Sequence, residues 1–153
     1  MTSQCLEQGS FMKASARNQF SGVIKEVILG AVNAEVHVGL PGGETIVASI
    51  TKDSVEALGI RKGMDILALV KAPQIIIVSD FAGYKISARN QLPGIVSAIK
   101  PGAVNAEVDI QLAGGQIIAA TVTNDSAETL GLRKGQPATA VFKAGAVILA
   151  VGN

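Results

Sequence analysis

The pentapeptide SARNQ occupies residues 15–19 and recurs, letter for letter, at residues 87–91. The shift of 72 positions from Ser15 to Ser87 keeps the rest of the chain in register: GAVNAEV at 30–36 recurs at 102–108. Self-similarity at one fixed offset is the signature of a duplicated structural unit. The sequence therefore predicts one small module used twice, and the matched positions are the candidates for a shared function.

The composition predicts that the module is built from strands. Hydrophobic residues make up 48% of the chain and aromatic residues only 3%, so the core must come from Val, Ile, Leu and Ala. Branched aliphatic side chains favour strands. A unit this small has a core that supplies only a few kcal/mol, and such modules often gain stability by docking on each other or by oligomerising.

Charge and targeting signals restrict the partners and the compartment. Lys and Arg number 13 against 12 Asp and Glu, so no global field attracts nucleic acid or an acidic membrane. The leader lacks the pattern of a secretory signal, and the apolar stretch 66–78 is too short to span a bilayer. The single Cys5 cannot form an intramolecular disulfide. We expect a cytoplasmic protein without a membrane partner.

Alternating and continuous apolar runs predict five strands in each repeat. In the first repeat these are FSGVIKEVILG (20–30), AEVHVGL (34–40), ETIVASI (44–50), DILALVKA (65–72) and QIIIV (74–78). The second and third strands are joined by a Pro-Gly-Gly turn, in which glycine readily takes the positive φ of hairpins. The second repeat follows the same pattern.

Between the third and fourth strands, residues 51–59 have helical spacing. Asp53 or Ser54 is the expected N-cap, Glu56 is the capping-box partner of Asp53, and Gly59 is the C-terminal stop. The helix has two turns at most.

Five short strands and one small helix favour an OB-like barrel over a sandwich, which usually needs about seven strands. The predicted fold class is all-β with one short helix per repeat, arranged as two tandem OB-like five-stranded antiparallel β-barrels. The predicted units are a flexible leader (1–14), a first domain (15–79), a connector (80–86) and a second domain (87–152).

Catalytic signals are weak. The only histidine, His37, corresponds to Asp109 in the second repeat, and on its strand it points away from the apolar face, which indicates a surface residue. Metal-ligand spacings and the GxxxxGK[ST] phosphate loop are absent from the sequence. We therefore expect no catalytic residue, no direct ligand of a metal cation and no enzyme activity.

Hydrogen-bond donors recur instead, and together they could cradle a small oxyanion. Each has an ordinary structural explanation taken singly, such as helix capping for Thr51 and Ser54, a solvated Arg17, or edge protection by Lys71. One Arg and one Lys are a minimal complement for a desolvated dianion, so the site is expected where two modules meet and pool their donors. The recurring donors are Ser15, Arg17, Asn18, Thr51, Ser54 and Lys71, with their images Ser87, Arg89, Asn90, Thr123, Ser126 and Lys143.

The motifs SARNQLPGIV, GAVNAEV, TNDSAETLGL and AVFKA closely resemble the Mop-like, molybdate- or tungstate-binding domain of the molbindins. The resemblance covers both repeats. It implies a di-domain molbindin: a bacterial cytoplasmic protein of molybdenum storage or homeostasis, with an OB-like fold and oxyanions at interfaces among six domains. For a tandem chain this implies a homotrimer, with molybdate or tungstate as the ligand and no organic cofactor.

The resemblance also implies particular ligand residues. Matched by motif, the oxyanion-binding residues are Ser15, Arg17, Thr51, Ser54, Lys71 and Ala72, and in the second repeat Ser87, Arg89, Thr123, Ser126, Lys143 and Ala144. A second class of site near a three-fold axis is placed at Val32, Asn33, Val104 and Asn105. GAVN could equally be a turn between strands.

Three functions remain in competition. Storage is favoured because the leader is too short for a DNA-binding domain and the chain has no Walker loop. An alternative is a molybdate-responsive interaction module that signals to a partner protein, because it needs the same pocket. An OB-type nucleic-acid module is disfavoured by four Phe, one Tyr, no Trp and almost no net charge. The sequence leaves the choice among molybdate, tungstate and sulfate open.

Overall fold

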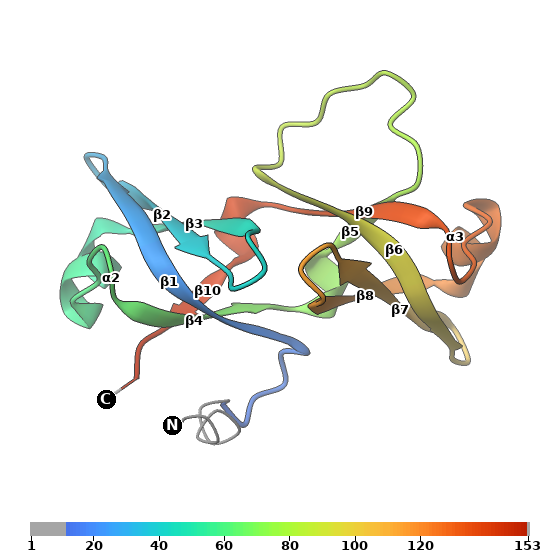
Figure 1. Ribbon diagram of the computed structural model, residues 1–153, viewed down its shortest axis with the longest axis horizontal. Coiled ribbons are helices and arrows are strands. Elements are labelled where there is room, and N and C mark those ends of the chain that lie inside the picture. The colour runs from blue at the N-terminus through green and yellow to red at the C-terminus, as the bar shows by residue number, and fades with distance from the viewer. Residues whose placement is uncertain (1–11, 153) are drawn as a thin grey trace.

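The computed structural model describes residues 12–152, which form two five-stranded antiparallel sheets (Figure 1). Each repeat also contributes one short α-helix and one 3-10 turn. The all-β class with one helix per repeat is thus confirmed, while closure of either sheet into a barrel stays a prediction. The first repeat supplies β1 (Asn18–Leu29), β2 (Asn33–Gly39), β3 (Thr45–Thr51), α2 (Lys52–Leu58), β4 (Asp65–Val70), η1 (Ala72–Gln74) and β5 (Ile76–Val78). The second supplies β6 (Asn90–Pro101), β7 (Asn105–Leu112), β8 (Ile117–Thr123), α3 (Asn124–Thr129), β9 (Pro137–Phe142), η2 (Ala144–Ala146) and β10 (Ile148–Ala150).

The two repeats exchange their last strands. The strand orders are β10-β4-β1-β2-β3 and β5-β9-β6-β7-β8, so β5 lies in the sheet of the second repeat and β10 in that of the first. Ile148 pairs with Leu69 and Ile76 with Val141, and Figure 1 shows both short strands beside their adopted partners. The expectation that each repeat forms a sheet from its own five strands was wrong for the fifth strand.

The exchange has a simple physical basis. Each last strand has only three residues, and its central side chain, Ile77 or Leu149, is buried in the shared core. The two repeats present closely similar edges at β4 and β9, so a hydrophobic pattern specifies that a strand forms but not which of two like edges it joins. The result is an interlocked pair, which suits modules too small to be very stable alone.

The core follows the alternation predicted for the second strand. Val36 and Val38 are fully buried and Leu40 is 5% exposed, and all three belong to a hydrophobic cluster that includes residues of both sheets. His37 lies on the opposite face, as expected. It is half-buried and contacts Glu35, however, and is not a freely solvated residue.

The cap of helix α2 confirms the capping role considered for Thr51, but not Asp53 or Ser54 as the N-cap residue. Thr51 is the N-cap, and its Oγ1 accepts a hydrogen bond of 3.0 Å from the backbone N–H of Ser54. Asp53 lies inside the first turn, so Asp53 and Ser54 as N-caps were wrong by two or three positions. Gly59 ends the helix in the left-handed conformation at φ 65°, as predicted. Thr123 and Ser126 repeat the cap in α3.

The two β-hairpins that precede the helices touch each other. Gly43 and Gly115 take positive φ, as their turns require. Gly42 and Gly114 have a different role: a Cβ on Gly42 would lie 2.5 Å from the Cα of Gly114, and Glu44 Oε2 accepts a 2.9 Å hydrogen bond from the Gly114 N–H. The repeats therefore approach so closely at this point that neither can carry a side chain.

Replacing Gly42 with Ala should lower the free energy of unfolding by about 1–3 kcal/mol, because the new methyl group must push backbone against backbone. Gly145→Ala is the matched control, since an added Cβ there meets no atom within 4 Å and its φ is not positive. Urea denaturation of both variants measures the difference. Equal stability of the two would show that the hairpins do not meet in solution.

Candidate functional site

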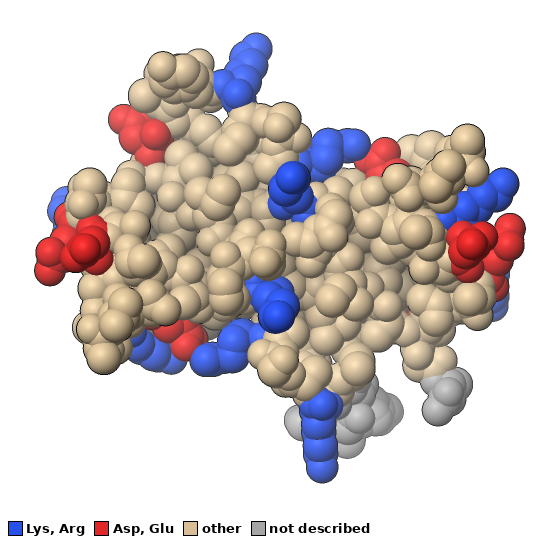
Figure 2. All heavy atoms as spheres, turned by 180° about the vertical axis from the view of Figure 1, so that it is seen from behind, with Lys and Arg blue, Asp and Glu red and all other residues tan. Residues whose placement is uncertain are grey.

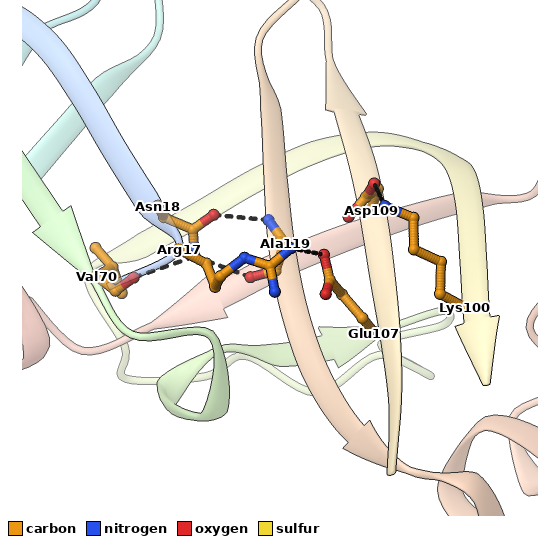
Figure 3. A network of polar contacts seen from close by, with 7 residues as sticks. All are labelled: Arg17, Asn18, Val70, Lys100, Glu107, Asp109 and Ala119. Carbon is orange, nitrogen blue, oxygen red and sulfur yellow. Dashed lines mark hydrogen bonds and ion pairs between the residues drawn. The ribbon is translucent and has the colours of Figure 1, made fainter. Parts of the chain in front are cut away.

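The arginine of each SARNQ motif reaches into the other repeat. Arg17, just before β1, donates through Nη2 to Glu107 Oε2 of β7 at 2.7 Å, as Figure 3 shows. In the mirrored arrangement Arg89, just before β6, forms an ion pair with Glu35 of β2. More than half of each arginine side chain is exposed, at 58% and 55%. The two repeats therefore meet at two seams, one marked by Arg17 and Glu107 and the other by Arg89 and Glu35. Both guanidinium groups remain accessible to a solute.

The asparagine of each motif links the repeats through buried hydrogen bonds. Ala119 N–H donates to Asn18 Oδ1 at 2.7 Å, and Asn18 Nδ2 donates to the carbonyls of Ala119 and Val70 (Figure 3). Asn90 bonds to Val47 N–H and C=O at 2.7 and 2.8 Å. Because β3 and β8 are the edge strands of their sheets, each carboxamide takes the place of a neighbouring strand. Asn18 and Asn90 were expected in the oxyanion cradle, and the structure instead uses them to join the repeats.

One cavity at the seam joins predicted site residues from both repeats. Its volume is about 440 Å³, and Arg89 and Ala144 of the second repeat line it together with Asn33 of the first. Helix η2, which begins at Ala144, packs on β3. In the same way η1, which begins at Ala72 of the first repeat, packs on β8 of the second repeat. Residues predicted for one site thus come from different repeats.

Of the predicted site residues, only Asn33, Arg89 and Ala144 line this cavity. Asn33 pairs with Thr51 across β2 and β3, and Asn105 pairs with Thr123 in the same way, so the two predicted classes of site adjoin. Thr51 and Thr123 each donate their hydroxyl to the serine three positions later, Ser54 or Ser126. Val32 and Val104 are 71% exposed, and their carbonyls accept from the first residue of the following helix.

Two lysines and two serines of the predicted set are exposed. Within residues 12–152 the side chains of Lys71, Lys143, Ser15 and Ser87 make no hydrogen bond or ion pair with other described residues. Ala72 and Ala144 follow the two lysines and are buried, and because alanine has no polar side chain, only their backbone groups could form hydrogen bonds with a ligand. A ligand would therefore not have to break any contact between these side chains and another described residue.

Electrostatics keeps the carboxylate of this cavity ionised. Burial alone raises the pKa of Glu35, but hydrogen bonds and charge attraction from Arg89 and His37 outweigh it, so the pKa lies below its ordinary value. The distance from His37 Nε2 to Glu35 Oε2 is 3.2 Å. In the second repeat Asp109 stands in place of His37 and pairs with Lys100 at 3.6 Å. The two seams, one with Arg89 and Glu35 and the other with Arg17 and Glu107, are therefore related but chemically unequal.

Sequence reasoning missed Glu35, Glu107 and Ser49 as parts of the site. The two glutamates recur within GAVNAEV, so their duplication was visible, but a carboxylate does not suggest an anion site. Ser49 lines the cavity from the middle of β3, where its spacing carried no signal.

Two further observations concern residues 12–152. No group of three or more His, Cys, Asp and Glu side chains gathers there as it would around a metal cation. Nor does that part of the chain hold a helix with the length and apolarity needed to cross a membrane.

Comparison with known proteins agrees with this architecture. Residues 14–77 and 86–149 each match the TOBE domain. The crystal structure of the cytoplasmic molybdate-binding protein ModG with molybdate bound superposes with a TM-score of 0.89 at 46% identity, covering 92% of this chain and 100% of that one. The fold is a tandem arrangement of two like domains, and the chain belongs to the TOBE-domain family, in the di-domain, Mop-like form.

Two sequence relatives are longer than this chain. The molybdenum transport protein ModE of Herbaspirillum seropedicae is 46% identical over 140 residues, which are 92% of this chain and 52% of that protein. The molybdenum-pterin-binding protein MopA of Rhodobacter capsulatus is 42% identical over 140 residues, 92% of this chain and 53% of that protein. The chain spans about half the length of these relatives.

Proposed function

We propose that the protein binds molybdate, or tungstate, reversibly at the seams between its repeats and serves in storage or homeostasis of the metal. The observation that carries the proposal is the cavity of about 440 Å³ in which Arg89 and Ala144 of one repeat face Asn33 of the other. A tetrahedral dianion needs cationic and neutral donors from several directions, and a seam between two modules supplies them. The match to a molybdate-bound structure supports the choice of ligand.

The proposed ligand residues are the exposed arginines, lysines and hydroxyls at both seams, together with backbone N–H groups beside Ala72 and Ala144. One seam takes Ser87, Arg89, Lys143 and Ala144 from the second repeat with Thr51 and Ser54 from the first. The other takes Ser15, Arg17, Lys71 and Ala72 with Thr123 and Ser126. Val32, Asn33, Val104 and Asn105 are assigned to the second class of site, formed when three chains associate as a homotrimer.

The proposed role is noncatalytic, and the proposed location is the cytoplasm. Figure 2 shows Lys and Arg side chains mostly separated by uncharged surface on one face, with acidic groups toward both ends. That distribution supports a small anion as the ligand over a nucleic acid, which needs a continuous basic track.

Calorimetric titration of the protein with sodium molybdate tests the proposal, with sodium sulfate as the matched anion. We expect saturable heat with molybdate and a much weaker response to sulfate. A protein that takes up neither anion, or both with equal affinity, would contradict specific storage of molybdenum.

A second function has support from the relatives. Several matching proteins bear the names of transcriptional regulators, and the chain matches about half of each. An interaction module that reports molybdate to a partner protein would use the same seam. Co-purification of a partner in only one of the molybdate-free and molybdate-loaded states would favour this role over storage.

A further inference from the structure

The proposed anion cavity contains a carboxylate. Glu35 lines it beside Arg89, its side chain is only 26% exposed, and the two form an ion pair. At the other seam Glu107, 19% exposed, pairs with Arg17 at 2.7 Å. A carboxylate next to a bound dianion is unfavourable: even with water-like screening, a separation of roughly 6 Å lowers affinity about tenfold. A site built only for tight anion binding would not place a glutamate there twice.

We propose that Glu35 and Glu107 set the affinity of the two seams: in the ligand-free protein each occupies the arginine that the oxyanion requires, and the oxyanion displaces it. The inference rests on the proposed function. Carboxylates and oxyanions compete for the same fork of guanidinium N–H groups. Each glutamate holds its arginine at the seam when the site is empty and opposes the ligand when the site fills, which favours release.

The burial of the four side chains supports displacement. Both glutamates lie mostly within the protein on central strands, β2 and β7, whereas both arginines are more than half exposed on the segments just before β1 and β6. The arginines are therefore the mobile partners, and the carboxylates are the fixed ones. A ligand at the seam needs only the arginines to swing.

The surroundings of the two carboxylates differ. Glu35 is approached by Arg89 and by His37, whereas Glu107 is approached by Arg17 alone among the described side chains that form ion pairs, since Lys100 pairs with Asp109. The two glutamates also lie at different seams, Glu35 with Arg89 and Glu107 with Arg17. The two substitutions should therefore act on different sites and are best made separately.

Titration calorimetry with sodium molybdate on Glu35→Gln and Glu107→Gln tests the proposal. Glutamine keeps the shape and one acceptor for the arginine but removes the negative charge. We expect each variant to bind molybdate about 5- to 10-fold more tightly at one class of site, and the gain to shrink at high ionic strength. Asp65→Asn is the charge-matched control, because Asp65 lies at the exposed start of β4 in a different cavity.

Thermal unfolding without ligand separates this role from a purely structural one. If the glutamates only join the repeats, both variants lose stability and bind molybdate no better than Asp65→Asn, and the inference is overturned. A gain in affinity, with or without lower stability, supports it. If the wild-type protein itself takes up no molybdate, the proposed function fails and the inference with it. Wild-type binding without a gain in either variant overturns the inference alone.

Discussion

Removing both motif arginines, Arg17→Ala with Arg89→Ala, is expected to weaken molybdate binding by about 10- to 100-fold at each seam. A hydrogen bond between a charged donor and a charged ligand contributes about 1.5–3 kcal/mol, and 1.4 kcal/mol corresponds to tenfold in affinity. Each arginine supplies the guanidinium at its seam, and the neighbouring lysine cannot replace its forked donor geometry. Titration calorimetry measures the loss.

The fold should survive this double substitution. Both arginines are more than half exposed, and exposed ion pairs contribute at most about 1 kcal/mol each. Arg61→Ala with Arg133→Ala is the matched control, because these exposed arginines also form a duplicated pair and the change removes the same charge. If the control weakens binding as strongly, general electrostatic attraction rather than the seam accounts for affinity.

Asn90→Ala is expected to lower the free energy of unfolding by about 2–4 kcal/mol. The substitution removes the carboxamide that pairs with both backbone groups of Val47, and it leaves a buried N–H and a buried C=O without partners. Each such orphaned group costs about 1–3 kcal/mol. Asn18→Ala should lower the free energy of unfolding by a similar amount, through the lost hydrogen bonds to Ala119. The summed loss in the double variant should approach the whole free energy of unfolding of a typical small protein.

Gln91→Ala provides the comparison for Asn90→Ala in urea denaturation. Gln91 is the next residue in the motif, and its amide donates to the carbonyls of Ile86 and Ala88 at the exposed surface. Water can replace these bonds, so the change should cost less than about 1 kcal/mol. Equal losses at positions 90 and 91 would mean that the buried carboxamide does not join the repeats.

Local elements were predictable because their signals are local. The alternation of AEVHVGL placed Val36 and Val38 in the core, the Gly-Gly turns marked the hairpins, and Gly59 ended its helix in the left-handed conformation. Capping was considered for Thr51, but Asp53 or Ser54 was the expected N-cap residue, because threonine at position 51 also fits the last residue of a strand. It is in fact both, since β3 ends at Thr51 and Thr51 caps α2.

The candidate site was only partly predictable. The recurrence of the motif identified Arg17 and Arg89 as candidate site residues, and the structure places each at a seam. Recurrence in the sequence could not indicate which side chain of the other repeat each arginine contacts. Asn18 and Asn90 also recur as donors, yet they are 3% and 1% exposed and form hydrogen bonds with the backbone of the opposite repeat. Glu35 and Glu107 could be recognised only once the arginines had found them.

The sequence by itself determined the duplication, the strands and helix of each unit, and which polar residues recur in both units. Only the tertiary structure decided that β5 and β10 each join the sheet of the opposite repeat. It also decided that the arginine of each SARNQ motif pairs with a glutamate of the opposite repeat, which places a carboxylate at each seam. The physical reason is that the preference of a residue for strand or helix depends on its neighbours along the chain. The edges of β4 and β9 that the last strands join are closely similar in the two repeats, so this local preference cannot choose between them. Which edge is used depends on how both repeats pack together.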